Sequence, residues 1–256
     1  MKVIILASGK GERLYPLTKS KPKPLVKVGN RELLDHQMKI LVECGLEDII
    51  ITTGPFEDQI HEYVEKNYPS LNIQYVKNPK YLSTNYIYSM WLTKKFIDDD
   101  VILLHCDLLF DKSLMEKLIS KKENHVLVNK KIKLPDKDFK AVVRDGRVVR
   151  IGVEFYGKNT FACFPMYKFS EKDFSIWLNE IEKYVKRGKV NIYSENVLNK
   201  ILDKILLYPL YFSDKLCMEI DTKDDMEIAE NILGGRSGRE GSNQVSYGIK
   251  GNSRRV

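Results

Sequence analysis

Short apolar runs alternate with helical patterns through the first half of the chain. Residues 2–7, KVIILA, are typical of a buried strand, and residues 32–44 carry apolar side chains at helical spacing until Gly45 ends the pattern. The same reasoning predicts strands at residues 49–53, 73–76 and 101–105 and helices at residues 58–66 and 85–96. This alternation predicts an α/β fold with a doubly wound, mostly parallel, Rossmann-like sheet flanked by helices.

The pattern changes after residue 121. Asp145-Gly146 joins two short apolar runs and is a strong β-hairpin signal. The other expected elements are a strand near residues 161–167, a helix that Ser170 opens, helices at residues 195–205 and 222–233, and a strand at residues 207–212. We expect one domain over residues 1–233, in which residues of about 122–233 form a smaller extension of the sheet.

Composition places the chain among ordinary globular proteins. Of its 256 residues, 43% are hydrophobic and 30% are charged, values near the average for such proteins. The longest apolar run, residues 3–7, is too short to cross a bilayer and lacks the features of a signal peptide. We therefore expect a cytoplasmic protein with no membrane insertion, whose four scattered cysteines are reduced core residues.

The net charge of +7 is concentrated near the carboxyl terminus. Residues 234–256 hold five basic residues and one acidic residue, which leaves +3 for the rest of the chain. This segment is rich in Gly, Ser, Asn and Arg and has no apolar periodicity, so we expect a flexible basic tail or a remnant of cloning. A body of low net charge argues against a nucleic-acid partner.

A glycine-rich loop follows the first predicted strand. Gly9 and Gly11 would let backbone N–H groups approach phosphate oxygens, which is the basis of an anion nest. The loop is not a Walker A motif, and Leu14 stands where a dinucleotide-binding G-x-G-x-x-G has its third glycine. The two glycines therefore indicate a phosphate site of unspecified kind.

Carboxylates follow two later apolar stretches. Asp107 stands at the carboxyl end of VILLHCD, the edge at which doubly wound sheets bind ligands. Glu219 and Asp221 would share one face of a short strand, and hard oxygen ligands suit Mg²⁺. Helix capping is the alternative for both aspartates. His105, within the same apolar stretch as Asp107, is interpreted as a hydrogen-bonded core residue.

The block LASGKGERLYPLTKSKPKPLVKVGN, residues 6–30, resembles the signature of the nucleotidyltransferase superfamily that includes sugar-1-phosphate nucleotidylyltransferases. The resemblance implies that the loop wraps a triphosphate and that Arg13 and Lys23 stabilise negative charge during attack at the α-phosphorus. Fixed cations suit a site where negative charge develops. Residues of about 1–121 would then bind the nucleotide, and residues of about 122–233 the acceptor.

Four later segments, NPKYLSTNYIYSMW, HCD, NIYSENVLN and CMEIDT, resemble one branch of that superfamily. It contains CTP:phosphocholine cytidylyltransferases and relatives that act on 2-aminoethylphosphonate or other phosphorylated amino compounds. The resemblance covers residues of about 1–233. It implies Mg²⁺, for which Mn²⁺ can substitute, on Asp107 and Asp221 with the assistance of Glu219. The implied cytidine and triphosphate pocket consists of Leu6, Ala7, Ser8, Gly9, Gly11, Gly54, Asn85 and Ser89.

The acceptor segment of that branch matches this chain at Tyr193, Glu195 and Asn196, but Ser194 stands where the phosphocholine enzymes have an aromatic residue. Because a quaternary ammonium prefers an aromatic cage, this departure favours a primary ammonium facing Glu195. An ordinary residue at a helix amino terminus is the alternative for Glu195.

These residues predict in-line attack of a phosphate or phosphonate oxygen on MgCTP, with release of pyrophosphate and formation of a CDP-linked or CMP-linked product. Phosphocholine, 2-aminoethylphosphonate and an amino-acid phosphate such as phosphoglutamine are the candidate acceptors, used in the decoration of surface polysaccharide or lipid. A sugar-1-phosphate nucleotidylyltransferase using UTP, CTP or dTTP is the nearest alternative, and a nucleotide sensor without catalysis is another. A homodimer is left open.

Overall fold

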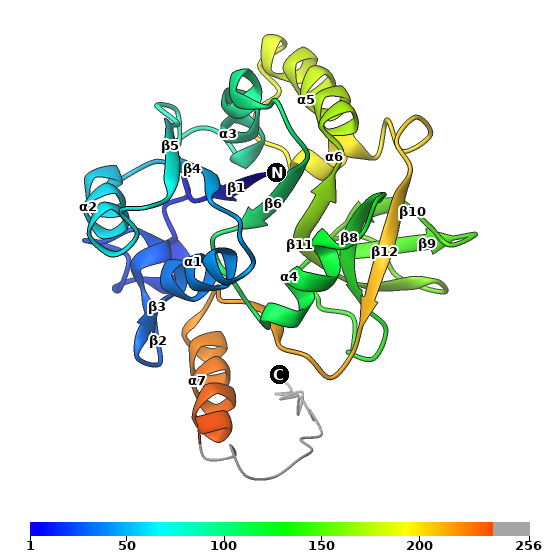
Figure 1. The fold of residues 1–256 in the computed structure, drawn as a ribbon. Coiled ribbons are helices and arrows are strands. Elements are labelled where there is room, and N and C mark those ends of the chain that lie inside the picture. Colours follow the sequence, from blue (N-terminus) through cyan, green and yellow to red (C-terminus); the bar gives the residue numbers. More distant parts are fainter. Residues whose placement is uncertain (238–256) are drawn as a thin grey trace, which may run out of the picture.

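A nine-stranded mixed sheet forms the centre of the computed structural model, which describes residues 1–237 (Figure 1). Its strands are β1 (Lys2–Leu6), β4 (Asp48–Thr53), β5 (Asn72–Lys77), β6 (Val101–His105), β8 (Asn124–Asn129), β9 (Lys140–Arg144), β10 (Arg147–Gly152), β11 (Thr160–Phe169) and β12 (Leu207–Phe212). Two small sheets pair β2 (Lys27–Val28) with β3 (Arg31–Glu32), and β7 (Leu108–Phe110) with β13 (Cys217–Glu219).

Seven α-helices accompany these strands within the described residues. They are α1 (Leu33–Glu43), α2 (Glu57–Asn67), α3 (Tyr86–Thr93), α4 (Lys112–Ile119), α5 (Glu171–Lys186), α6 (Ser194–Leu198) and α7 (Lys223–Ser237). Short 3-10 turns occur at Glu12–Leu14, Lys23–Leu25 and Lys94–Phe96. No helix within residues 1–237 is both long and apolar enough to span a membrane.

The predicted parallel core is confirmed. Strands β5, β4, β1 and β6 are consecutive neighbours and run parallel, so their carboxyl ends meet at one edge. The long strand β11 runs antiparallel to β6, β8 and β9 and connects this core to the second half of the chain. Strands β8 and β9 are antiparallel to β11 and therefore run in the direction of the core. Strand β12 is parallel to β8 and has the same direction, whereas β10 is antiparallel to β9.

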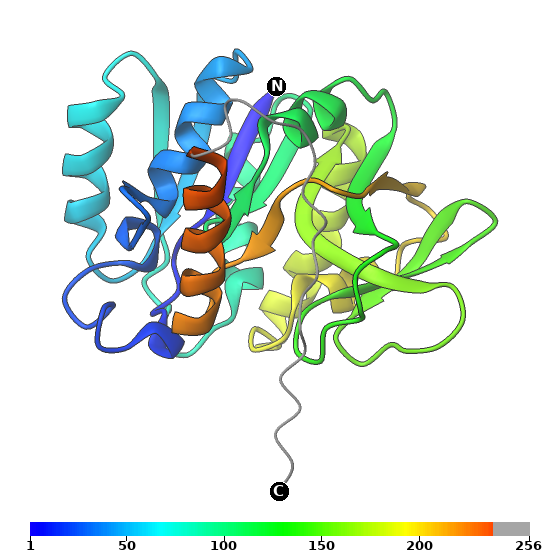
Figure 2. The ribbon, with the colours of Figure 1, turned by 90° about the horizontal axis from the view of Figure 1, so that it is seen from below.

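Helices cover both faces of the sheet, as the doubly wound prediction requires. Side chains alternate along β1, so that Val3 and Ile5 join one apolar cluster and Ile4 and Leu6 join another. The first cluster includes α1, α2 and α4, and the second includes α3, α5 and α6. Figure 2 shows α1 and α4 on one side of the sheet and α5 and α6 on the other.

Two predicted boundaries are wrong. The helix expected over residues 195–205 ends at Leu198 and continues as turns, in which the amides of Lys200 and Ile201 bond the carbonyls three residues earlier. The tail does not begin at residue 234, since α7 extends to Ser237. The rest of the predicted tail, residues 238–256, lies outside the described residues.

The prediction of reduced cysteines is confirmed, and the prediction that they are core residues is confirmed for three of the four. All four thiols are free, and Cys106, Cys163 and Cys217 are buried while Cys44 is half-buried. Burial raises the pKa of each thiol above its ordinary value, so these thiols are protonated and unreactive near neutral pH.

Candidate active site

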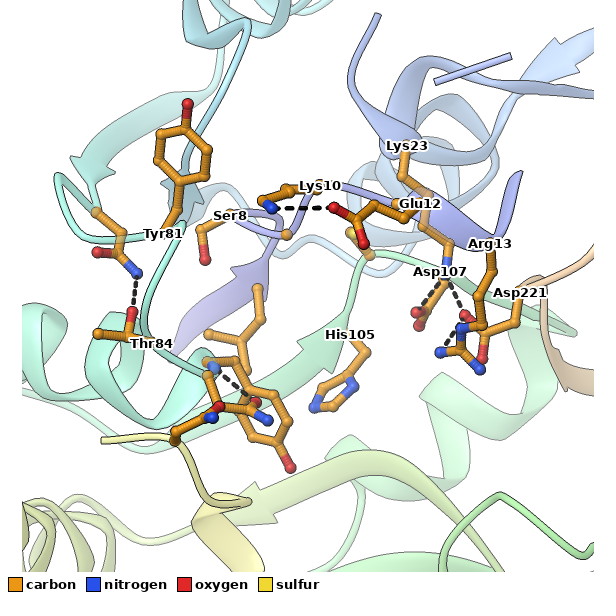
Figure 3. Close-up of a pocket in the computed structure, with 18 residues that line it drawn as sticks. Ser8, Lys10, Glu12, Arg13, Lys23, Tyr81, Thr84, His105, Asp107 and Asp221 are labelled. Atoms are coloured by element: carbon orange, nitrogen blue, oxygen red, sulfur yellow. Dashed lines mark hydrogen bonds and ion pairs between the residues drawn. The ribbon is translucent and has the colours of Figure 1, made fainter. Parts of the chain in front are cut away.

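A cavity of about 500 Å³ opens beside the carboxyl ends of β1 and β6 (Figure 3). Six segments form its wall: the glycine loop, the 3-10 turn that starts at Lys23, the stretch that leads into α3, the end of β6, the loop before α6, and Asp221 after β13. Its lining residues are Leu6, Ser8, Gly9, Lys10, Gly11, Glu12, Arg13, Lys23, Asn78, Tyr81, Thr84, Asn85, Tyr86, His105, Cys106, Asp107, Asn191 and Asp221.

Glycine is required at one position within the glycine loop and at one position beside it, for different reasons. Gly11 has a left-handed φ of 66°, and a Cβ there would lie 3.1 Å from Cβ of Lys23. The hydroxyl of Thr18 donates to the Gly11 carbonyl at 2.7 Å and closes the loop. Gly54, at the end of β4, supports the loop from below, because a Cβ there would lie 2.2 Å from the Ser8 carbonyl oxygen.

Lys23 lies between two carboxylates at the floor of the cavity. Its ammonium is 2.8 Å from Oδ2 of Asp107 and 2.6 Å from Oδ1 of Asp221, and only 8% of the residue is exposed. Burial alone would lower the pKa of Lys23, but the two negative charges outweigh it and raise that pKa. Arg13 contacts the same oxygen of Asp221 at 2.8 Å and is largely exposed. Figure 3 shows these four side chains converging.

Further carboxylates surround this cluster. Burial, and then repulsion from Asp107, Asp138 and Asp221, raises the pKa of Glu219 well above its ordinary value. Burial and the charge of Asp221 also raise the pKa of Asp138. Burial alone would raise the pKa of Asp107, but the charge of Lys23, the neighbouring His105 and hydrogen bonds together lower it. Asp138 was not predicted from sequence, since it lies in a loop without a motif.

The interpretation of His105 as a hydrogen-bonded core residue is wrong. His105 lines the cavity, and its Nε2 has no hydrogen-bond partner among the described residues. Its position as the last residue of a parallel strand could have indicated this, because ligands bind at that edge. His105, Asp107 and Glu219 each offer an atom that lies within 4.8 Å of the others, a spacing that can hold a metal ion.

A polar network forms the opposite wall of the cavity. The hydroxyls of Ser8 and Ser89 are 2.6 Å apart, and the side-chain amide of Asn78 donates to Ser89 at 2.9 Å and to Thr84 at 3.1 Å. Asn85 caps α3 and accepts from the amide of Tyr86. Asn78 and Thr84 were not predicted as site residues, although both lie in the NPKYLST segment.

The predicted acceptor segment lies behind the cavity wall. Glu195 is 1% exposed, and its carboxylate accepts hydrogen bonds from the hydroxyls of Tyr86, Tyr167 and Ser194. Asn196 caps α6 through the amide of Tyr193 at 3.1 Å. The ring of Tyr193 lies 6.1 Å from that of Tyr86 and is partly exposed. This segment therefore reaches the cavity through Tyr86, rather than through Glu195 itself.

The structure separates the predicted site residues into two groups. Those that line the cavity are Leu6, Ser8, Gly9, Gly11, Arg13, Lys23, Asn85, Asp107 and Asp221. Those outside the cavity lining are Ala7, Gly54, Ser89, Tyr193, Glu195, Asn196 and Glu219. Ser89 contacts the lining directly, through Ser8.

The order of β-strands and the cation–carboxylate cluster at their edge define a nucleotide-handling enzyme, and comparison with known proteins gives the family. Residues 2–151 match the model of the family described as Nucleotidyl transferase. The chain belongs to this family and is an enzyme of the nucleotidyltransferase class. The predicted superfamily is therefore confirmed.

Two relatives align along nearly their whole length. The chain is 26% identical to the CTP:phosphoglutamine cytidylyltransferase of Campylobacter jejuni subsp. jejuni, with 89% of this chain and 98% of the relative covered. It is 29% identical to the choline-phosphate cytidylyltransferase of Streptococcus pneumoniae, with 91% and 98% covered. A third match, at 32% identity, covers 48% of this chain but spans only 20% of the CMP-5'-(3-aminopropyl)phosphonate synthase of Streptomyces rubellomurinus.

Solved structures confirm the fold. The CTP:phosphocholine cytidylyltransferase from Streptococcus pneumoniae superposes with a TM-score of 0.74 at 24% identity, covering 91% of this chain and 98% of that one. The inositol-1-phosphate CTP transferase from T. maritima superposes with a TM-score of 0.75 at 25% identity, covering 91% and 96%. The core fold is thus shared by enzymes whose names give different acceptors.

Proposed function

We propose that this enzyme is a cytidylyltransferase that transfers CMP from MgCTP to the phosphate or phosphonate of a small amino compound and releases pyrophosphate. The observation that carries the proposal is the position of Lys23. This buried cation lies between Asp107 and Asp221 in the same cavity as the glycine loop. A fixed positive charge beside an anion nest suits the negative charge that develops at a transferred phosphoryl group.

The residues present fit a divalent cation. Oδ1 of Asp107 is shielded from solvent and has no hydrogen-bond partner among residues 1–237, and Glu219 is nearby among other carboxylates. Asp107, Glu219 and Asp221 are the oxygen donors that would hold Mg²⁺, for which Mn²⁺ can substitute. When bound, the ion supplies charge neutralisation of the phosphates and helps to align them.

Lys23 and Arg13 have complementary roles in this proposal. Lys23 is buried and held at two points, so it can stabilise charge at a defined position without reorganising. Arg13 is exposed, and its contact with Asp221 leaves it able to reach an incoming phosphate. No general base is needed, because the phosphate or phosphonate of the acceptor is already an anion at neutral pH. Alignment and charge neutralisation are sufficient.

The preference for CTP is supported by the named activities of the two full-length relatives. The polar network of Ser8, Asn78 and Ser89 is a suitable place for a pyrimidine, because cytosine offers both an acceptor and an amino donor. The network is held by hydrogen bonds before any ligand arrives, which reduces the cost of ordering it.

The relatives also support an amino compound as the acceptor, since their names include phosphoglutamine, choline phosphate and an aminopropylphosphonate. In this chain the acceptor would meet Tyr86, His105 and Asn191, which line the cavity beyond Asp107. Glu195 would act indirectly, because its carboxylate is engaged by three hydroxyls behind that wall. A sugar-1-phosphate or polyol-phosphate acceptor is the second candidate, favoured by the likeness to an inositol-1-phosphate enzyme.

A substrate grid tests the proposal. Pyrophosphate release is measured with each of CTP, UTP, ATP and dTTP against phosphocholine, phosphoethanolamine, 2-aminoethylphosphonate, phosphoglutamine and two sugar 1-phosphates, and products are identified by mass spectrometry. We expect turnover with CTP and at least one amino acceptor. Turnover only with a sugar phosphate would select the second candidate. CTP binding without turnover for any acceptor would contradict both.

A further inference from the structure

Two polar atoms at the end of β6 lack the partners that buried polar atoms normally have. Nε2 of His105 and Oδ1 of Asp107 are both shielded from solvent and have no hydrogen bond within the described part of the chain. Burying such an atom without a partner is energetically unfavourable. Because the two residues offer ligand atoms within 4.8 Å of each other and of Glu219, one missing ligand would account for both.

The chemistry of this trio indicates a cation. Imidazole nitrogens and carboxylate oxygens are both donor atoms for divalent ions, and the fold brings one imidazole to two carboxyl groups. Asp221 is engaged in other contacts, since its Oδ1 forms ion pairs with both Lys23 and Arg13. His105 is therefore the third donor that the structure brings to Asp107 and Glu219.

The position of the imidazole is fixed from behind. The rings of His105 and Tyr86 meet edge to face with centroids 4.7 Å apart. The hydroxyl of Tyr86 is in turn held by buried Glu195. A ring positioned in this way loses little conformational freedom when it binds a ligand, as expected for a metal-binding histidine with an ordered outer shell.

We propose that His105, Asp107 and Glu219 form a divalent-cation site that favours Mn²⁺ or a similar first-row transition ion over Mg²⁺ and that fills in the absence of nucleotide. Mg²⁺ prefers oxygen ligands only, whereas imidazole suits transition ions. The site lies inside the nucleotidyl-transfer centre and in that respect rests on the proposed function. Its test uses no nucleotide, so failure of ion binding and failure of the transferase reaction are distinguishable.

Electron paramagnetic resonance provides the test. The full chain, freed of any polyhistidine tag and of bound metal, is titrated with MnCl₂ alone, and nitrogen coupling to the bound ion is measured by electron spin-echo modulation. We expect one bound Mn²⁺ per chain with a ¹⁴N signal from imidazole. Selective labelling with ¹⁵N-histidine should convert that signal to ¹⁵N, which identifies the ligand without any substitution.

Substitutions assign the nitrogen to one histidine. His105→Gln should abolish the nitrogen signal, weaken Mn²⁺ binding about tenfold or more, and reduce the preference for Mn²⁺ over Mg²⁺ in competition. The matched control is His125→Gln, because His125, on β8, forms a hydrogen bond with the carbonyl of Glu123 and lies outside the cavity lining. No Mn²⁺ binding without nucleotide, no nitrogen signal in the wild-type chain, or an unchanged signal in His105→Gln would each overturn the proposal.

Discussion

Replacing Lys23 by Met should harm both stability and catalysis, because the change leaves carboxylates without their cation. Methionine keeps the length and the apolar stem of lysine, so packing changes little. The ammonium that lies 2.8 Å from Asp107 and 2.6 Å from Asp221 is lost. Asp221 retains Arg13, but Asp107 retains no cation that contacts it among the described residues.

The size of the effect follows from burial. Removing one partner of a buried ion pair costs about 3–5 kcal/mol, because the other charge stays buried. Since Arg13 still contacts Asp221, we expect a loss near 3 kcal/mol at pH 7.5, measured by urea unfolding. The control is Lys27→Met, which removes an exposed lysine 3.8 Å from Glu32 and should cost less than about 1 kcal/mol.

The pH dependence of the free energy of unfolding provides a second, independent test. In the wild-type chain Lys23 helps to lower the pKa of Asp107 below its ordinary value. The Asp107 carboxylate therefore stabilises the fold at any pH above that ordinary pKa, and this stabilisation is lost as the pH falls through the lowered pKa of the folded state. Without Lys23 the buried carboxylate binds a proton more readily. The stability difference between Lys23→Met and wild type should therefore shrink by at least about 1 kcal/mol between pH 7.5 and pH 5.

Catalysis is the third readout. Loss of a cation that acts on the transition state costs on the order of 100-fold or more in turnover, measured as pyrophosphate release by protein that is still folded. Unfolding free energies within about 1 kcal/mol of wild type at pH 7.5 would contradict the buried ion pair. Near-normal turnover in folded Lys23→Met would refute the catalytic role.

Three other substitutions test the cavity wall. Gly54→Ala should cost about 1–3 kcal/mol and lower turnover, because its Cβ would lie 2.2 Å from the Ser8 carbonyl and displace the loop; unchanged thermal unfolding would contradict this. Gly9→Ala should leave stability within about 0.5 kcal/mol of wild type, since no atom lies within 4 Å of its Cβ, yet raise the KM for CTP if the amide approaches phosphate. Glu195→Gln should cost about 1–3 kcal/mol and raise the KM for the acceptor but not for CTP, because it loosens Tyr86. A change in acceptor KM without destabilisation would instead indicate that Glu195 contacts the acceptor.

The parallel core was predictable because its signals are local. Strands β1, β4 and β6 are apolar runs followed by helical patterns, and alternation between them defines a parallel sheet. Strand β7 was missed because it has three residues and its partner β13 lies more than 100 positions away. The short strand expected to carry Glu219 and Asp221 is β13, but it ends at Glu219, so Asp221 lies beyond it. Strand β8 was missed because its apolar run is short, although all of its residues are buried between β11 and β12.

The site was predictable to the extent that motifs carry it. Lys23, Asp107 and Asp221 were identified from three separate segments, but no pattern states that the lysine bonds both aspartates. Glu195 is a residue whose surroundings could not be predicted from the sequence. A carboxylate in a polar segment is a reasonable ligand for an ammonium, yet the fold buries it against hydroxyls that come from α3, β11 and α6.

The charge balance of the cavity connects the ion to the nucleotide. Lys23 and Arg13 contact the carboxylates of Asp107 and Asp221 in the cavity wall, and burial together with nearby negative charge raises the pKa of both Asp138 and Glu219. A triphosphate entering this cavity would add negative charge to carboxylates that already repel one another, so its binding requires further positive charge. An ion on the carboxylates would also release Lys23 from part of its present attraction and leave it free to face phosphate. We therefore expect the same lysine to stabilise the site without nucleotide and, if a divalent ion neutralises the carboxylates, to face phosphate in the loaded site.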